Sequence, residues 1–259
     1  MNDNPLFSIL LCVYNGEDYI SEAINSIIDQ DFIDWELIII DDGSTDETPN
    51  LVKGYLKDDT RIKLYSKKNS GLTKSLNYGL GYCKGDWIVR HDADDRSSKY
   101  RLSRIYNVIT TKPLDFVYSQ SYFVSGNKVS IKPSSLYKYA FNDNVLKFGN
   151  HIIHGSIAIR KEVIKLVKYD ESCIVAQDFD LYLRLLGENL RTEMICEPLY
   201  TVQENESSIS ALRYKEQVET VKMSLRKHIG TDKYLDINRG VIFKLYKLSC
   251  VLYYYLKGY

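Results

Sequence analysis

Short apolar runs alternate with segments of helical periodicity between residue 7 and about residue 122. After the first run, apolar side chains recur every three or four residues from Ile20 to Ile28, which predicts a buried helix face with Asn15 as N-cap. A second helix is expected at about residues 72–82. The apolar runs predict buried strands at residues 7–13, 35–40, 62–65 and 87–89. Strands joined by crossover helices predict an α/β fold with a mostly parallel central sheet flanked by helices.

The pattern is less regular beyond this region. Apolar residues at 116–124 and 128–131 flank Gly126-Asn127, a turn pair that is typical of β-hairpins. Residues 152–159 predict a further strand, and residues 175–186 predict a loop that continues into a helix. We expect these elements to complete the same domain.

A basic tail follows a polar connector at residues 203–210. Residues 211–259 contain ten Lys or Arg and four Asp or Glu, a charge of +6, and we treat them as a helical C-terminal extension of a main domain, residues 1–210. Residues 241–255 are mostly apolar or aromatic, and two hypotheses stay open for them. The segment packs on the main domain or is buried in a homo-oligomer, or residues 235–259 make a peripheral contact with an anionic membrane surface.

The composition excludes several classes of protein. The chain has 259 residues, 44% of them hydrophobic, enough for one large domain with an appendage. Its 34 basic and 34 acidic residues cancel, so no overall field attracts nucleic acid, and no nucleic-acid partner is expected. Five cysteines without a C-x-x-C pair disfavour a disulfide framework or structural zinc. With no basic leader and no apolar run of roughly 18 residues, the expected location is cytoplasmic or peripheral at the inner face of the membrane.

Three of the predicted strands end in polar clusters. Tyr14-Asn15-Gly16-Glu17 follows the first strand, Asp41-Asp42-Gly43-Ser44 the second, and Asp92-Ala93-Asp94-Asp95 the fourth. Carboxyl ends of parallel strands meet at one edge of a sheet, where ligands bind. Carboxylates two residues apart can share a hard cation whose other ligands are phosphate oxygens and water. The clusters therefore indicate a nucleotide-diphosphate site.

Each acidic cluster also has a simpler interpretation. Asp, Gly, Ser and Thr are common in turns and at helix starts, which is sufficient to explain residues 41–46 taken alone. Residues 92–94 taken alone are equally well a solvated loop. Their joint occurrence at the ends of two predicted strands favours the ligand site.

Taken in order, these motifs resemble those of family 2 glycosyltransferases, which have the GT-A fold. The resemblance spans about residues 6–210 and rests on residues 8–15, residues 35–46, Asn69-Ser70-Gly71 with Asn77, and residues 92–95. It implies transfer of a sugar from a nucleotide-diphosphate donor, expected to be a UDP-sugar, to an acceptor hydroxyl with inversion at the anomeric carbon. It also implies a divalent cation, Mg or Mn, and a saccharide or lipid-linked saccharide acceptor in bacterial surface polysaccharide or glycolipid synthesis.

The resemblance also assigns roles to single residues. Asp42 is expected to contact the nucleobase, Asp94 to bind the metal directly, and Asp92 to contact the ribose or the metal with its water. Lys74 is expected near the pyrophosphate. Gln203 replaces a His or Arg that closes over the diphosphate in some relatives, and Cys12 replaces a Pro. The full predicted nucleotide-sugar site comprises Cys12, Tyr14, Asn15, Glu17, Asp42, Asn69, Gly71, Lys74, Asp92, Ala93, His154 and Gln177.

An inverting transfer needs a general base for the acceptor hydroxyl. The family provides an Asp at the start of a helix, and the Gln177-Asp178 pair matches, so Asp178 is the expected base. Helical spacing makes Asp180 an ion-pair partner of Arg184 instead of a second base. In the simpler alternative, Asp178 only stabilises the positive end of the helix.

Two other functions share part of this pattern. A sugar nucleotidylyltransferase has a related core, but a Gly-rich, Arg-bearing loop should follow its first strand, and this chain has Tyr14-Asn15-Gly16-Glu17 there. A non-catalytic nucleotide-binding module would also use an acidic pocket. Replacement of Asp178 by Asn separates that module from an enzyme, because only an enzyme has turnover to lose.

Overall fold

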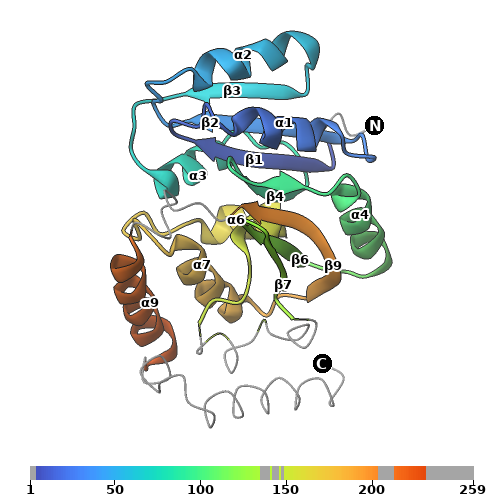
Figure 1. The fold of residues 1–259 in the computed structure, drawn as a ribbon. Coiled ribbons are helices and arrows are strands. Elements are labelled where there is room, and N and C mark those ends of the chain that lie inside the picture. The colour runs from blue at the N-terminus through green and yellow to red at the C-terminus, as the bar shows by residue number, and fades with distance from the viewer. Residues whose placement is uncertain (1–3, 135–140, 142–145, 147–148, 204–212, 232–259) are drawn as a thin grey trace.

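The structure is a computed structural model that describes residues 4–134, 141, 146, 149–203 and 213–231. Within these residues, nine strands form one mixed sheet in the order β3-β2-β1-β4-β8-β6-β9-β5, with β7 paired to β6 (Figure 1). The predicted segments 235–259 and 241–255 lie outside the described residues.

The first half of the chain builds the parallel part of the sheet. Its strands are β1 (Phe7–Val13), β2 (Trp35–Asp41), β3 (Ile62–Ser66) and β4 (Trp87–Asp92), and its helices are α1 (Ile20–Ile28), α2 (Thr48–Asp58) and α3 (Leu72–Leu80). Every residue of β1 and β2 is buried, as expected for parallel strands covered by helices on both faces. This region confirms the predicted strands and helices.

The second half adds antiparallel pairs and more helices. These elements are β5 (Arg96–Ser97), α4 (Arg101–Thr111), β6 (Phe116–Ser125), β7 (Lys128–Lys132), the 3₁₀ turn η2 (His154–Ser156), β8 (Ala158–Arg160), α6 (Lys161–Val167), α7 (Gln177–Leu185), the 3₁₀ turn η3 (Leu186–Glu188), β9 (Thr192–Gln203) and α9 (Tyr214–Ile229). β8 runs antiparallel between β4 and β6, whereas β9 is parallel to β6. The pairing of Ser125 with Lys128 confirms the predicted hairpin.

Two local predictions were wrong. α1 begins at Ile20 with Tyr19 at its N-cap, and Asn15 lies in a left-handed conformation with φ of 52°. Of the strand predicted at residues 152–159, only its end is extended, because η2 interrupts it. A Cβ at Gly155 would lie 2.3 Å from the ring of Tyr200, so this close approach depends on glycine.

The core has two layers, one on each face of the sheet. On one face, alternate residues of β1 such as Ile9 pack with α1, α2 and α4. On the other face, Leu10 packs with α3, α6 and α7, and Leu225 of α9 belongs to the same cluster. Figure 1 shows α9 beside α7, and the two helices are in contact. The described part of the C-terminal extension is therefore helical and packs on the main domain.

No helix among the described residues combines the length and the apolar character needed to cross a bilayer.

Candidate active site

The strand order brings the predicted polar clusters to one edge of the sheet. β1 pairs with β2 on one side and with β4 on the other, so the chain changes direction beside β1. Cys12 pairs with Asp92, and Val13 pairs with Asp41. In open α/β sheets, such a switch point at the carboxyl ends of the strands is where ligands bind.

Cys12 marks the centre of this edge. Burial raises the pKa of its thiol to about 12, and the charges of Asp92 and Asp42 also act on it. The thiol is therefore neutral at pH 7 and is not a nucleophile. The acidic clusters after β2 and β4 lie on either side of the end of β1, because β1 pairs with both strands. The effect of both carboxylates on the pKa of Cys12 agrees with this placement.

Asp42 fixes the loop that precedes α3. Its carboxylate accepts hydrogen bonds from the backbone N–H of Ser70 at 2.9 Å and of Gly71 at 2.8 Å, and it forms an ion pair with Lys67. The side chain is only 6% exposed. The predicted residues Asn69 and Gly71 are thereby held next to Asp42.

The predicted residues after β1 are joined to the loop after β2. Asn15 donates its backbone N–H to Ser44 Oγ at 2.9 Å and accepts from Thr45 N at 2.9 Å. Glu17 Oε2 accepts from the backbone N–H of Glu47 at 2.9 Å. Tyr14, in contrast, is 49% exposed. Asn15 and Glu17 thus shape this loop, whereas the Tyr14 ring faces solvent.

The acidic loop after β4 is anchored by two buried side chains. Arg90 forms an ion pair with Asp92 at 2.5 Å and donates to the carbonyl of Leu10 at 2.9 Å. The Tyr200 hydroxyl accepts from the backbone N–H of Asp92 at 2.8 Å. Both anchors are at most 1% exposed. His91, between Arg90 and Asp92 in the chain, is fully buried, and burial lowers its pKa to about 3, so its ring is neutral.

Carboxylates crowd this loop. Burial, together with the charge of Asp92, raises the pKa of Asp94 to about 6. Burial and both neighbouring carboxylates raise the pKa of Asp95 to about 8, and Asp95 accepts from the backbone N–H of Gln203 at 3.1 Å. Ala93, between Asp92 and Asp94, is buried. Carboxylates that repel one another are stabilised by a hard divalent cation, which prefers oxygen ligands. Asp94 and Asp92 are the residues able to hold such a cation.

Asp178 lies at the start of α7, in its first turn. Burial raises the pKa of Asp178 to about 6, and the charge of Asp92 adds to the rise. The two carboxylates therefore lie within electrostatic range of each other. Asn150 Nδ2 donates to Asp178 Oδ2 at 2.6 Å. The neighbouring Gln177 is 8% exposed. A carboxylate with a pKa near 6 is well matched to accept a proton at neutral pH.

His154 makes a specific contact near this group. Its Nε2 lies 2.8 Å from the hydroxyl of Tyr169, and the two rings pack edge to face. Burial lowers the pKa of His154 well below its usual value, so the ring is neutral. The charges of Asp178 and Asp92 act on Tyr169. His154 therefore lies next to the residue that borders the acidic centre.

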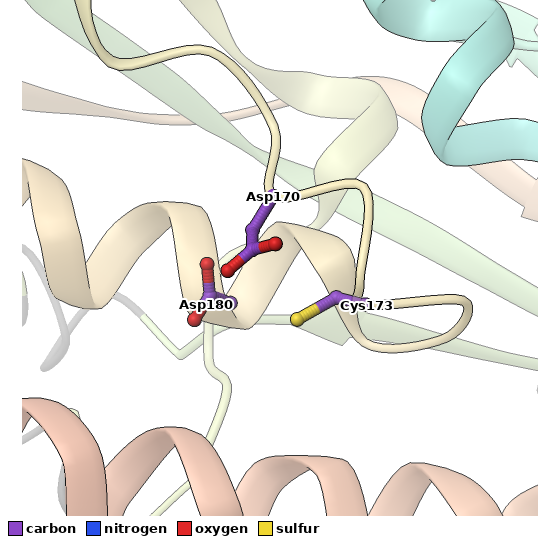
Figure 2. A group of neighbouring side chains, drawn as sticks. All are labelled: Asp170, Cys173 and Asp180. Atoms are coloured by element: carbon purple, nitrogen blue, oxygen red, sulfur yellow. The ribbon is translucent and has the colours of Figure 1, made fainter.

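A second group of potential metal ligands comprises Asp170, Cys173 and Asp180 (Figure 2). Asp180 is 1% exposed and pairs with Arg184 at 2.8 Å and with His228 at 3.0 Å. Asp170 pairs with Lys227 at 3.2 Å. Arg184 and Lys227 already compensate the two carboxylates, so neither carboxylate needs a metal ion for charge compensation. The contact of Asp180 with His228 joins α7 to α9. The contact of Asp180 with Arg184 is the predicted one.

Three residues of this site were not predicted from the sequence. Arg90 interrupts an apolar strand, and a buried charged side chain needs a partner of opposite charge. The sequence therefore contained an indication that Arg90 pairs with a nearby carboxylate. Tyr200 and Asn150 carried no comparable signal. Lys74 lies apart from these three, in a cavity beside α3.

Comparison with known proteins agrees with this architecture. Residues 8–167 match the family described as glycosyl transferase family 2. The O-antigen biosynthesis glycosyltransferase WbnJ of Escherichia coli is 30% identical over 82% of this chain and 85% of its own length. The chain belongs to glycosyltransferase family 2.

Solved structures show the same fold. S. aureus TarS in complex with UDP-GlcNAc superimposes with a TM-score of 0.72 and 21% identity, covering 94% of this chain and 72% of that chain. The mannosyltransferase PcManGT of Pyrobaculum calidifontis, in complex with GDP-Man and Mn²⁺, gives a TM-score of 0.67 and 16% identity, covering 96% and 74%. The fold is GT-A, as predicted, and the family match favours a glycosyltransferase over a nucleotidylyltransferase.

Proposed function

We propose that the protein transfers a sugar from a UDP-sugar to a hydroxyl group of a saccharide or lipid-linked saccharide, with inversion at the anomeric carbon. The observation that carries this proposal is the position of Asp178, a carboxylate with a pKa of about 6 within electrostatic range of the acidic loop. WbnJ, which acts in O-antigen biosynthesis, supports an acceptor in surface polysaccharide synthesis. The UDP-GlcNAc complex of TarS supports the donor class.

The reaction follows from the arrangement of the carboxylates. The acceptor oxygen attacks the anomeric carbon from the side opposite the leaving group while its proton passes to Asp178. The bond between the anomeric carbon and the diphosphate oxygen breaks, and the nucleoside diphosphate leaves with the electron pair. Asn150 orients the Asp178 carboxylate through its hydrogen bond. Attack from the opposite face is what inverts the configuration.

The donor is held at the other side of the site. Asp94 and Asp92 would hold a divalent cation, Mg or Mn, which when bound neutralises the charge of the diphosphate. The ion pair with Arg90 holds the Asp92 carboxylate in place and reduces its repulsion with the neighbouring carboxylates of the loop. Asp42 and the segment of residues 12–17 are the proposed contacts for the nucleoside.

The experiment that tests the proposal compares Asp178→Asn with Glu188→Gln. Glu188 is an exposed acid just beyond α7, so its change to an amide is a matched control. A panel of nucleotide sugars first identifies the donor through thermal stabilisation. Asp178→Asn should retain donor binding and lose about 10²-fold or more in turnover, and NMR of the product should show inverted anomeric configuration. Retained configuration, or full activity of Asp178→Asn, would refute the proposal.

A further inference from the structure

A cavity of about 390 Å³ lies beside α3, apart from the acidic centre. Its lining consists of Lys67, Ser70, Lys74, Asn77, Tyr78, Lys168 and Glu171. Neither Asp94 nor Asp178 belongs to its wall. Tyr169 is 6% exposed and contacts both regions, because Asn77 of the cavity lining bonds to its backbone and its hydroxyl contacts His154 on the side of the acidic centre.

The walls of the cavity are held in place by Asn77. Its side-chain oxygen accepts from Tyr169 N at 3.0 Å, and its Nδ2 donates to Tyr169 O at 2.9 Å and to Glu171 Oε1 at 3.1 Å. These bonds fasten residues 169–171 to α3. The cavity therefore has a defined shape, and its volume lies in the usual range for small-molecule pockets.

The charges that line the cavity do not cancel. Lys67 is already paired with Asp42 and lies 2.5 Å from Ser70 Oγ, so its positive charge is compensated. Glu171 is the acid of the lining. Within the described part of the chain, neither Lys74 nor Lys168 has an ion-pair partner. Two ammonium groups thus share a cavity with one carboxylate, an arrangement that favours an anionic ligand.

Lys168 occupies a backbone conformation that only glycine adopts without strain. Its φ of 53° and ψ of 173° directly follow α6, at a position where helices commonly end in glycine. A lysine is therefore destabilising here relative to glycine. The cost is understandable if the Lys168 ammonium is needed at the cavity that its residue lines.

We propose that this cavity is a binding site for a phosphate group, distinct from the site of the donor. Lysine ammonium groups are compact point charges with several donors each, which suits the many acceptor oxygens of a phosphate. The volume allows an esterified phosphate, such as a phosphorylated small molecule or the phosphate of an acceptor. Along the sheet, Asp42 at the end of β2 lies between the acidic loop after β4 and Lys67 after β3. The Lys67 end of the cavity is thus on the far side of Asp42 from the acidic loop.

Titration calorimetry of the full chain with inorganic phosphate and with glycerol 3-phosphate tests the site, with glycerol as the uncharged control. Lys74→Ala and Lys168→Gly should each weaken phosphate binding at least about tenfold, whereas Lys165→Ala, an exposed lysine of α6 outside the cavity, should not. Lys168→Gly should also melt at or above the wild-type temperature, because it relieves the backbone strain. Binding lost without stability lost distinguishes a ligand role from a structural one.

Two further arms identify the ligand. Tighter binding of glycerol 3-phosphate than of inorganic phosphate would support an esterified ligand, and equal binding would support free phosphate. Phosphate binding should persist in saturating UDP, and competition by UDP would overturn the proposal by making the cavity part of the donor site. Wild-type binding by Lys74→Ala would also overturn it, whether or not Lys168→Gly folds. None of these readouts depends on transferase activity.

Discussion

Asn150 donates a 2.6 Å hydrogen bond to Asp178 from a position 28 residues earlier in the chain. Burial raises the pKa of the Asp178 carboxyl, and this hydrogen bond acts in the opposite direction by stabilising the ionised form. Asn150 therefore helps to set both the orientation of the Asp178 carboxylate and its pKa.

The first prediction concerns the pH dependence of turnover. Because the pKa of Asp178 is about 6, kcat should fall about tenfold per pH unit below that value, as the base becomes protonated. Asn150→Ala removes a bond to the ionised form, so it should move the acidic limb to higher pH. Rates from pH 5 to 8 measure the shift, with Asn107→Ala, an exposed asparagine of α4, as control. An unchanged limb in Asn150→Ala would contradict this role.

The second prediction concerns the stability of Asp178→Asn. The pKa of Asp178 is raised from 3.8 to about 6 on folding, so the folded state binds the proton more tightly than the unfolded state. The associated stability is complete below about pH 4 and lost as pH rises through 6. At pH 7.5, Asp178→Asn should therefore be more stable by about 1–2 kcal/mol. Urea unfolding at pH 7.5 and pH 4 measures the difference, which should vanish at the lower pH.

The third prediction concerns the cation. Asp94→Asn should raise the Mn²⁺ concentration needed for half-maximal thermal stabilisation by about tenfold or more, because it removes a charged oxygen ligand. EDTA should abolish the activity of the wild type. Asp86→Asn is the control, since Asp86 is exposed before β4, at the opposite edge of the sheet. Equal metal responses of the two variants would exclude Asp94 as a ligand.

The fourth prediction concerns Gly155. A methyl group at this position would overlap the Tyr200 ring, whose hydroxyl holds the backbone of Asp92. Gly155→Ala should cost about 1–3 kcal/mol in unfolding free energy and weaken metal binding by displacing the acidic loop. Gly187→Ala has no neighbouring atom within 4 Å of the added carbon and should be nearly neutral. Similar unfolding free energies for both variants would argue against this packing.

The fifth prediction compares two adjacent residues of α9. His228 pairs with the buried Asp180, and its removal in His228→Ala leaves a buried acceptor with fewer partners, which should cost about 1–3 kcal/mol. Lys227 pairs with Asp170 but its side chain is 59% exposed, so Lys227→Ala should cost under about 1 kcal/mol. Chemical denaturation of both variants checks the order of the two effects.

Much of the parallel half of the sheet could be predicted from the sequence. Strands buried on both faces appear as continuous apolar runs, and the face of α1 follows the helical repeat, so local pattern is sufficient there. The segment before β8 was harder, because its turn depends on the contact between Gly155 and Tyr200, which are far apart in the chain. The first half is determined by local periodicity, and the second by contacts between distant residues.

The candidate site divides in the same way. Asp92 and Asp178 follow from motifs, and the structure brings them within electrostatic range. Asn150 lies in an irregular stretch where residue type gives no indication of contact, so its bond to Asp178 could not be predicted. Asn15 and Glu17 were expected in the nucleotide-sugar site, and in the structure their side chains bind the backbone of the neighbouring loop. Their contact with a nucleoside stays a prediction.

The contacts between α9 and α7 have a consequence for the folding of this chain during its synthesis. Ser224 and His228 hold Asp180, which lies two residues after Asp178 on the same helix. A nascent chain on the ribosome can therefore complete the parallel strands, and every proposed donor contact, well before these supports have been translated. The helix that carries Asp178 gains the support of Ser224 and His228 only when α9 emerges, so a premature stop codon before residue 214 would leave the residues of the site present but α7 without these two contacts.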